Sequence, residues 1–131
     1  MCLFCKIVNH DIPSKIIYEN DYVVGILDIS QTTQGHTLII PKKHVENILE
    51  CPEDVLNNVF NTVSLVGNHL VKTLNAKGMN VLSNVHEIAG QSIMHFHVHL
   101  IPRYGVDDGF IVEMKSSNQE ATTELAESLK I

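Results

Sequence analysis

The spacing of hydrophobic residues changes along the chain, and each change predicts a different kind of element. Residues 15–19 and 22–27 are short runs rich in β-branched and aromatic side chains, and they flank a turn-prone Asn-Asp pair at 20–21. This arrangement predicts a β-hairpin, because such side chains favour strands and Asn and Asp favour turns. Residues 37–40, which end at a proline, predict a third strand.

The segment 52–74 has a different period. Its apolar residues recur at intervals of three and four, which places them along one side of a long helix. They are Val55, Leu56, Val59, Phe60, Val63, Val66, Leu70 and Leu74. We expect two further strands at 79–83 and 93–101, with a polar loop between them. Strands, one long helix and then strands again predict an α+β domain with an antiparallel sheet.

Length and composition favour a single domain with a hydrophobic core. The chain has 131 residues, of which 44% are hydrophobic. We expect the domain to span residues 1–110 and residues 111–131 to form a C-terminal tail. Within this tail, Leu125 and Leu129 have the spacing of an amphipathic helix, although a frayed terminus fits equally well. The sequence assigns no function to the tail.

The charge balance excludes some classes of partner. Fifteen acidic residues against nine Lys and Arg give a formal charge of −6, which opposes binding to nucleic acid. A small anionic ligand remains compatible, because backbone N–H groups and imidazoles can form a local anion pocket. No apolar run approaches the roughly 18 residues of a membrane span, and no signal peptide is apparent. We therefore expect a cytoplasmic protein without a membrane partner, in which the three cysteines are thiols or metal ligands.

The most informative stretch is MHFHVHLIPRY at 94–104, in which His95, His97 and His99 alternate with apolar residues. On a β-strand the three imidazoles would share one face, roughly 7 Å apart. Burying them requires partners for six ring nitrogens, so a functional site is a simpler explanation than a structural role. Two kinds of site fit. The imidazoles can bind a catalytic metal, or one neutral imidazole can attack an electrophile while its neighbours orient it and stabilise charge.

The loop before this stretch favours the nucleophilic interpretation. Gly90, Gln91 and Ser92 offer backbone N–H groups, an amide and a hydroxyl directly before the first histidine. Such donors suit the oxygens of a phosphate group. Alone, the three residues would indicate an ordinary polar turn. Next to the histidines, they predict a phosphate site.

Taken together, these segments resemble the histidine triad (HIT) family. The matching parts are CLFCKI at 2–7, LDIS at 27–30, GHTLIIPKKH at 35–44, Asn84, and GQSIMHFHVHLIPRY at 90–104. The resemblance therefore covers about residues 2–104. It implies a HIT-like α+β fold, with an antiparallel sheet of about five strands, one long helix and a short N-terminal helix.

The resemblance also implies an activity. HIT proteins of this kind are nucleotidyl hydrolases or transferases, which act on a nucleotide α-phosphate through a covalent nucleotidyl-histidine intermediate. The preferred expectation is a purine nucleoside phosphoramidase that forms a homodimer. A dinucleoside polyphosphate hydrolase is the first alternative, and a nucleotide-binding regulatory protein with little turnover is the second.

By position in the family motif, His97 would be the nucleophile and His99 would contact the phosphate and assist the leaving group. The second ring nitrogen of His97 should donate to a backbone carbonyl near His95, which would fix its tautomer. Gln91 and Ser92 match positions that contact the phosphate. Hydrogen-bond donors that are already in position before the reaction stabilise the charge that develops on the phosphate oxygens.

Other positions match the part of the family site that binds the nucleoside. Asp28 matches a carboxylate that accepts hydrogen bonds from the ribose hydroxyls, and a carboxylate suits a vicinal diol. Asn84 matches a residue near the scissile bond, and Gly90 would offer its backbone N–H group. Ile26 and Ile29 flank the carboxylate and would provide apolar walls for the base, although a role in the core explains them equally well.

Cys2 and Cys5 form a C-x-x-C pair, which alone indicates a redox pair, half of a metal site or chance. Two more ligands would complete a tetrahedral zinc site, and His44 and His95 are candidates. The resemblance supports this set, because some HIT proteins carry a structural zinc at matching positions. A site closed by four protein ligands would stabilise the fold and take no part in the chemistry. The resemblance places His36 behind the triad as a supporting residue.

Overall fold

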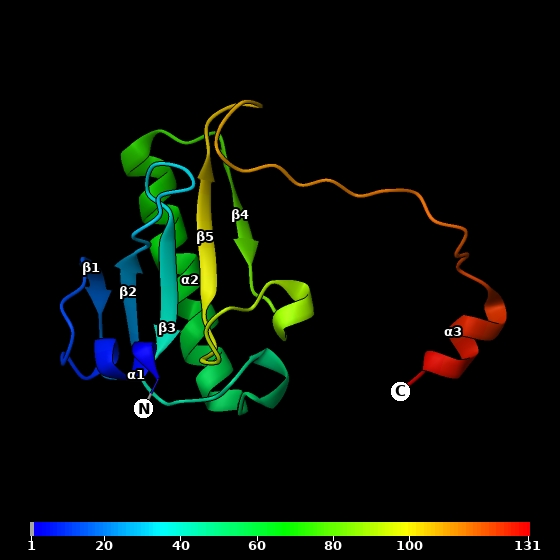
Figure 1. The fold of residues 1–131 in the computed structure, drawn as a ribbon, viewed down its shortest axis with the longest axis horizontal. Helices are drawn as coiled ribbons and strands as arrows, with labels where there is room; N and C mark the ends of the chain where they lie inside the picture. The colour runs from blue at the N-terminus through cyan, green and yellow to red at the C-terminus, as the bar shows by residue number, and fades with distance from the viewer. Residues whose placement is uncertain (1) are drawn as a thin grey trace.

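The computed structural model describes residues 2–131, and its centre is a five-stranded antiparallel sheet with the strand order β1-β2-β3-β5-β4 (Figure 1). One long helix covers one face of this sheet, and a short N-terminal helix packs on the opposite face. The predicted α+β fold, with a five-stranded antiparallel sheet, one long helix and a short N-terminal helix, is therefore confirmed. The elements are α1 (Leu3–Val8), β1 (Ile16–Glu19), β2 (Val23–Leu27), β3 (Thr37–Pro41), η1 (Ile48–Glu50), α2 (Glu53–Leu74), β4 (Gly78–Leu82), η2 (Glu87–Ala89), β5 (Val98–Arg103) and α3 (Thr123–Leu129).

The predicted hairpin between β1 and β2 is present, and the side chain of Asn20 forms its turn. The Asn20 side-chain oxygen accepts hydrogen bonds from the backbone N–H groups of Tyr22, at 2.8 Å, and Val23, at 2.9 Å. These two bonds close the turn locally, as Asn commonly does. On its other edge, β2 pairs with β3 along the full length of both strands.

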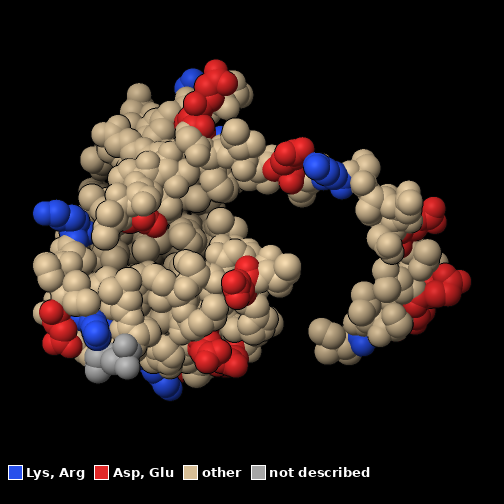
Figure 2. All heavy atoms as spheres, in the orientation of Figure 1, with Lys and Arg blue, Asp and Glu red and all other residues tan. Residues whose placement is uncertain are grey.

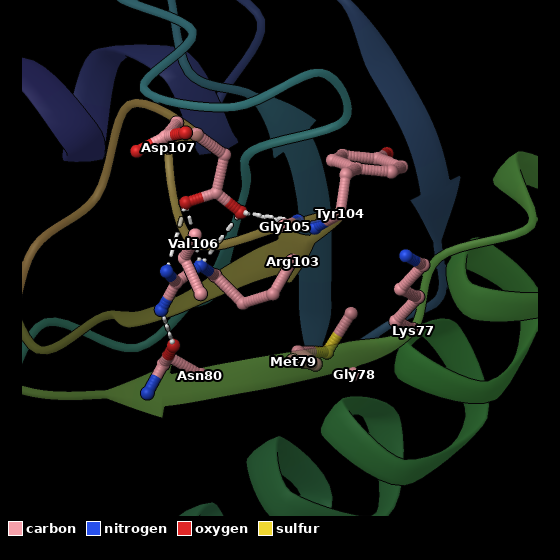
Figure 3. A pocket seen from close by; sticks show the side chains of 10 residues that line it. Lys77, Gly78, Met79, Asn80, Arg103, Tyr104, Gly105, Val106 and Asp107 are labelled. Atoms are coloured by element: carbon pink, nitrogen blue, oxygen red, sulfur yellow. Dashed lines mark hydrogen bonds and ion pairs between the residues drawn. The ribbon is translucent and has the colours of Figure 1, made fainter.

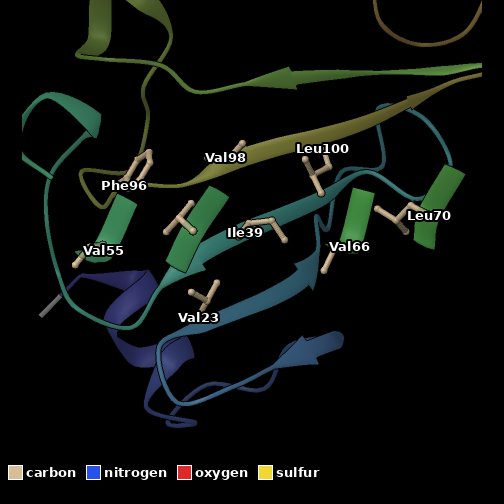
Figure 4. Close-up of a cluster of buried hydrophobic side chains, with 9 residues drawn as sticks. Val23, Ile39, Val55, Val66, Leu70, Phe96, Val98 and Leu100 are labelled. Atoms are coloured by element: carbon tan, nitrogen blue, oxygen red, sulfur yellow. The ribbon is translucent and has the colours of Figure 1, made fainter. Parts of the chain in front are cut away.

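Two separate hydrophobic cores cover the two faces of the sheet. Figure 4 shows the first, in which Val23 and Ile39 from the sheet pack against Val66 and other residues of α2. In the second core, α1 packs against the opposite face, where Val24 and Ile40 point. Both faces of β2 and β3 are covered, so these strands are apolar almost throughout instead of alternating.

The structure corrects the predicted strand at 93–101. The strand β5 begins only at Val98, and residues 93–97 form an irregular segment before it. In this segment the Phe96 N–H group donates to the Val45 carbonyl at 2.7 Å, outside the ladders of the sheet. The three histidines of the triad therefore do not share one strand face, because only His99 lies within β5.

The prediction that Pro102 ends the strand is also wrong, since β5 continues to Arg103. Pro102 lies opposite Met79 of β4, beyond the last residue that β3 pairs with β5. Its carbonyl accepts a hydrogen bond from the Thr33 hydroxyl at 2.6 Å. A proline is tolerated here because no β3 residue requires its missing N–H group.

The C-terminal tail leaves the domain and extends away from it in Figure 1. Every residue in 111–131 is exposed, and of the two alternatives for this segment the helix is present, as α3. Within residues 2–131, no helix has the length and apolar character needed to cross a bilayer. Figure 2 shows Lys and Arg side chains scattered among acidic ones on the face in view. The absence of a nucleic-acid partner stays a prediction from the net charge.

Candidate active site

The sheet register brings Asp28, His36 and His99 together from three different segments. The β2–β3 ladder ends at the pair Leu27 and Thr37, so Asp28 and His36 are the next residues on either side. The Asp28 N–H group donates to the His36 carbonyl at 2.9 Å, which extends the ladder by one bond. His99 lies opposite Leu38 in the β3–β5 ladder. A carboxylate and two imidazoles therefore meet at one end of the sheet.

The hydrogen bonds of His36 determine the tautomer of His99. The Thr32 backbone N–H donates to His36 Nδ1 at 3.4 Å, so in the neutral ring the hydrogen of His36 is on Nε2. That nitrogen lies 2.9 Å from His99 Nδ1 and 3.6 Å from Asp28 Oδ2. His99 Nδ1 is then the acceptor, and His99 carries its own hydrogen on Nε2. Burial, together with the nearby His97 and His36, lowers the pKa of His99 from 6.5 to about 4, so the ring is neutral near pH 7.

His97 has the geometry of a nucleophile. Its Nδ1 lies 2.7 Å from the His95 carbonyl oxygen, which can only accept, so Nδ1 carries the hydrogen and Nε2 keeps its lone pair. The predicted tautomer-fixing bond is thus confirmed. Burial lowers the pKa of His97 below its usual value of 6.5, which keeps the lone pair unprotonated near neutral pH. The Ser83 hydroxyl donates to the His97 carbonyl at 2.8 Å and holds the backbone.

The imidazoles of His97 and His99 line a cavity that also has apolar walls. Its volume is about 240 Å³, and Asp28, Ser92, His97 and His99 line it together with apolar residues of α1 and β2. A second cavity of about 660 Å³, with a mainly apolar lining, shares Asp28 and several of these apolar residues. The shared residues are Leu3, Ile7, Ile26, Leu27, Asp28 and Ile29. This combination suits a ligand with a charged group at one end and an apolar ring at the other.

A larger hollow of about 910 Å³ lies at the far end of β5, and Arg103, Asp108 and Asn80 in its lining are engaged with each other. The Arg103 guanidinium donates to both carboxylate oxygens of Asp108, at 2.8 and 2.9 Å, and to Asn80 at 2.8 Å. Figure 3 shows the link from β5 to Asn80 on β4. The Tyr104 N–H also donates to Asp108, at 2.9 Å. These bonds fix a turn, whereas the histidines combine an imidazole with a free lone pair and a carboxylate beside a cavity, so we place the candidate active site there.

Four side chains bring their potential metal-ligand atoms close together: those of Cys2, Cys5, His44 and His95. The six distances between the two sulfurs and two Nδ1 atoms are 3.1–3.6 Å. A tetrahedral zinc with bonds of about 2.0–2.3 Å would separate its ligands by roughly 3.3–3.8 Å, so the set fits a small metal ion. His95 Nε2 lies 2.8 Å from the Pro41 carbonyl, to which it donates, so His95 Nδ1 has a lone pair for a metal. All four predicted metal ligands are thus brought together.

Comparison with known proteins gives the family. The model of the HIT domain matches residues 9–106. This chain belongs to the HIT family. It is 47% identical over 109 residues to "Protein hit" of Bacillus subtilis, which covers 83% of this chain and 75% of that protein. A crystal structure of a HIT family protein from Bacillus anthracis superposes with a TM-score of 0.89 at 42% identity, over 98% of this chain and 97% of that one.

Three other HIT relatives have names that state an activity or a metal. Adenosine 5'-monophosphoramidase HNT1 of Saccharomyces cerevisiae is 38% identical over 85% of this chain and 68% of its own length. Adenylylsulfatase HINT3 of Arabidopsis thaliana is 40% identical over 78% of this chain and 52% of its own. A zinc-bound histidine triad family protein from Mycobacterium smegmatis superposes with a TM-score of 0.76 at 36% identity, over 81% and 77% of the two chains.

The side chain of Gln91, in the loop that precedes the triad, is buried and hydrogen-bonded. Its side chain is 2% exposed, and the amide nitrogen donates to the carbonyls of Glu46, at 2.6 Å, and Ile93, at 3.1 Å. Its side-chain oxygen accepts from the His86 N–H at 2.8 Å. Both amide hydrogens are engaged with protein carbonyls in this structure, and the expected contact of Gln91 with a phosphate stays a prediction. Gln91 fixes the loop that carries Ser92.

The other expected binding residues take different places around the site. Ile26 is 4% exposed and Ile29 fully exposed, and both line the cavity next to Asp28. Gly90 has φ of +104°, and a Cβ there would approach the Asn84 amide nitrogen to 3.2 Å. Asn84 and Gly90 thus pack against each other in the loop, and neither is among the described residues that line the cavity with His97.

The sequence analysis missed two features of the candidate active site. The apolar side chains of α1, including Phe4, form a wall of the cavity, although they read as a short buried helix. His36 was expected to support the triad, but its hydrogen bond to His99 was not foreseen. The sequence contained a signal for the first, since Phe4 lies between Cys2 and Cys5, and His95, a candidate partner of both, belongs to the triad.

Proposed function

We propose that this HIT protein is a nucleotidyl hydrolase or transferase, and that its substrate is a purine nucleoside 5'-phosphoramidate. The observation that carries the proposal is the His97 ring, whose Nδ1 is held by the His95 carbonyl while Nε2 is left as an unprotonated nucleophile. His97 lines a cavity together with His99, Asp28 and apolar walls. The similarity to the yeast protein named adenosine 5'-monophosphoramidase supports the choice of substrate.

The proposed reaction has two displacement steps. In the first, the His97 Nε2 lone pair forms a bond to phosphorus, the P–N bond breaks, and the leaving nitrogen departs as an amine after gaining a proton from solvent. In the second, a water oxygen bonds to phosphorus, the bond to Nε2 breaks, and the water loses one proton. One water is consumed, and His97 returns to its starting state. His99, with its hydrogen on Nε2, donates to a phosphate oxygen in both steps.

The nucleoside part of the substrate would occupy the remaining walls. Asp28 Oδ1 accepts from the Ser30 N–H at 2.8 Å, and this bond holds the carboxylate at the edge of both cavities. From there the carboxylate would accept hydrogen bonds from the ribose hydroxyls. The base would lie between Leu3, Ile7 and Ile26, and Ser92 would donate to the phosphate.

We further propose that Cys2, Cys5, His44 and His95 hold a structural zinc ion. The arrangement of the four ligand atoms supports this, as does the zinc-bound relative from Mycobacterium smegmatis. When bound, zinc would crosslink α1, the segment after β3 and the segment before β5. With four protein ligands it would have no open position, so it would stabilise the fold and supply no Lewis acid to the reaction.

A homodimer is the assembly that we propose. β4 is an edge of the five-stranded sheet, and its Val81 is 52% exposed. On α2, Phe60 and Leu65 are also exposed, by 39% and 55%. Apolar side chains along a free strand edge and a helix favour association with a second copy. Sedimentation analysis should give twice the mass of one chain. A cytoplasmic location stays a prediction.

The decisive test compares two substrates. The protein should release AMP from an adenosine 5'-phosphoramidate, and rapid acid quenching followed by mass spectrometry should detect one AMP group on the peptide that contains His97. Faster turnover of a dinucleoside tetraphosphate would instead favour the polyphosphate hydrolase. If both compounds remain intact while AMP still binds, the protein is a nucleotide-binding module and the proposal is wrong.

A further inference from the structure

The aromatic ring of Phe4 lies directly against the nucleophile. Phe4 belongs to α1 and is 3% exposed. Its ring centroid is 4.9 Å from that of His97, and the two planes are nearly perpendicular, at 87°. His99 borders the same imidazole with a centroid distance of 5.0 Å. The His97 ring therefore has two aromatic neighbours.

Packing must fix the direction of His97 Nε2, because one hydrogen bond does not. The torsion between the Cβ atom and an imidazole ring has a broad energy profile with two similar minima. The bond from His97 Nδ1 to the His95 carbonyl anchors one atom of the ring, but the ring can still tilt about this anchor. Phe4 blocks this tilt. Its ring neither donates nor accepts a conventional hydrogen bond, so it does not compete for either nitrogen.

The position of Phe4 depends in turn on the metal-ligand cluster, which comprises Cys2, Cys5, His44 and His95. Helix α1 has only six residues, which is too short to be stable without tertiary contacts. Cys2 caps this helix and Cys5 lies within it, so both ends of the turn that carries Phe4 are attached to the cluster. The ring of Phe4 also lies 6.0 Å from that of His95.

We propose that Phe4 is a positioning residue for His97, and that the metal-ligand cluster controls turnover by holding Phe4 in place. This inference rests on the proposed function. It links a site expected to be purely structural to the rate of the chemical step. A small misplacement of a reacting group costs up to about 100-fold in rate, so loss of the Phe4 ring should lower kcat by about 10- to 100-fold.

The kinetic test uses two phenylalanines that are matched in burial. Phe4→Leu should lower kcat by the stated factor and change KM by less, because the ring orients the nucleophile more than it holds the substrate. Phe96→Leu is the control. Phe96 is 1% exposed and is next to His97 in sequence, but it packs in the core under α2. Phe96→Leu should lower the melting temperature and leave kcat unchanged. Equal effects of both changes on kcat would overturn the proposal.

A double-mutant cycle tests the link to the cluster. If the cluster acts through Phe4, the variant Cys5→Ser with Phe4→Leu should have the same kcat as Cys5→Ser alone. Fully additive losses would show that the cluster does not act through Phe4. Should Cys5→Ser not fold, His44→Asn serves instead, because His44 is an exposed member of the cluster.

A spectroscopic readout separates this proposal from the proposed function. In the zinc-loaded protein at constant pH, NMR relaxation of the ¹³C–¹H groups in the His97 ring should show one rigid orientation. Phe4→Leu should lower the order parameter of this ring, whereas Phe96→Leu should not. An unchanged order parameter in Phe4→Leu would overturn the proposal. This measurement needs no substrate, so it decides the role of Phe4 even if no nucleotide conjugate is cleaved.

Discussion

His95 and His97 are two residues apart, yet they belong to two regions with different chemistry. In the metal-ligand cluster, His95 is fully buried, and both of its ring nitrogens are engaged, one with the Pro41 carbonyl and one with the other ligands. At the cavity, His97 has one nitrogen held by a carbonyl and the other left for reaction. The comparison teaches that the partner of the second ring nitrogen distinguishes an imidazole suited to bind a metal from one suited to act as a nucleophile.

The two regions also differ in what surrounds them. The cluster is closed by four side chains that satisfy each other. The region around His97 is a line of side chains from His36 through His99 to His97, and it ends at a cavity with apolar walls. Changes in the first region should therefore alter stability most, and changes in the second should alter rate most.

The largest expected effect is the loss of the nucleophile. His97→Gly should lower kcat by roughly 10⁴- to 10⁶-fold, because a covalent route has no substitute for the attacking nitrogen. The free energy of unfolding should change by less than about 2 kcal/mol, as for most single substitutions. Steady-state kinetics and urea unfolding check the two parts. Native turnover by this variant would refute the covalent mechanism.

A change in the cluster should lower stability most and should lower turnover far less than loss of His97 does. Cys5→Ser removes a ligand, so the protein should lose its zinc and melt on the order of 10 °C lower, because metal binding energy contributes to folding. Cys51→Ser is the control, since Cys51 is a free cysteine outside the cluster. Metal analysis and thermal unfolding measure these effects. If chelation abolished all activity while the fold stayed intact, zinc would be a catalytic ion.

The ribose contact should have an intermediate effect. Asp28→Asn keeps the shape of the side chain but removes its charge, which should lower kcat/KM by about 10- to 100-fold, the value of a charge-assisted hydrogen bond. A 2'-deoxynucleoside substrate should already be poor for the wild type and lose no more in the variant. Asp21→Asn, in the exposed β1–β2 turn, is the control. If Asp28→Asn lowered kcat/KM equally for the ribonucleoside and the 2'-deoxynucleoside substrate, Asp28 would not bind the ribose hydroxyls.

The smallest effect concerns the pH dependence of stability. The pKa of His99 is about 4 in the folded protein against an ordinary 6.5, so the unfolded chain binds the proton first as pH falls. Its contribution is complete above pH 6.5 and is lost as pH falls to about 4. His99→Gln should therefore show a shallower loss of unfolding free energy over this range. Urea titrations at several pH values measure the free energy of unfolding for both proteins. If the two curves against pH ran parallel, His99 would not be the cause of this pH dependence.

Much of the fold was readable because local pattern and packing agree. The three- and four-residue spacing in 52–74 predicted α2, and the Asn at position 20 predicted the hairpin turn. The alternation around His97 correctly predicted which side chains point to the core and which to the cavity, but it wrongly predicted that all of them lie on a strand. Phe96, Val98 and Leu100 do face the core under α2, while His97 and His99 face the cavity. The strand begins later than predicted because residues before Val98 bond to a loop and not to a neighbouring strand.

The sequence by itself determined which residue types are available: three histidines at alternate positions, a carboxylate at Asp28 and a cysteine pair near the start. Only the tertiary structure decided their partners. It placed His95 beside both cysteines, turned the Gln91 amide toward backbone carbonyls, and set Phe4 against His97. The physical reason is that hydrophobic spacing is a local property, whereas the partner of a ring nitrogen depends on segments that folding brings together from distant parts of the chain.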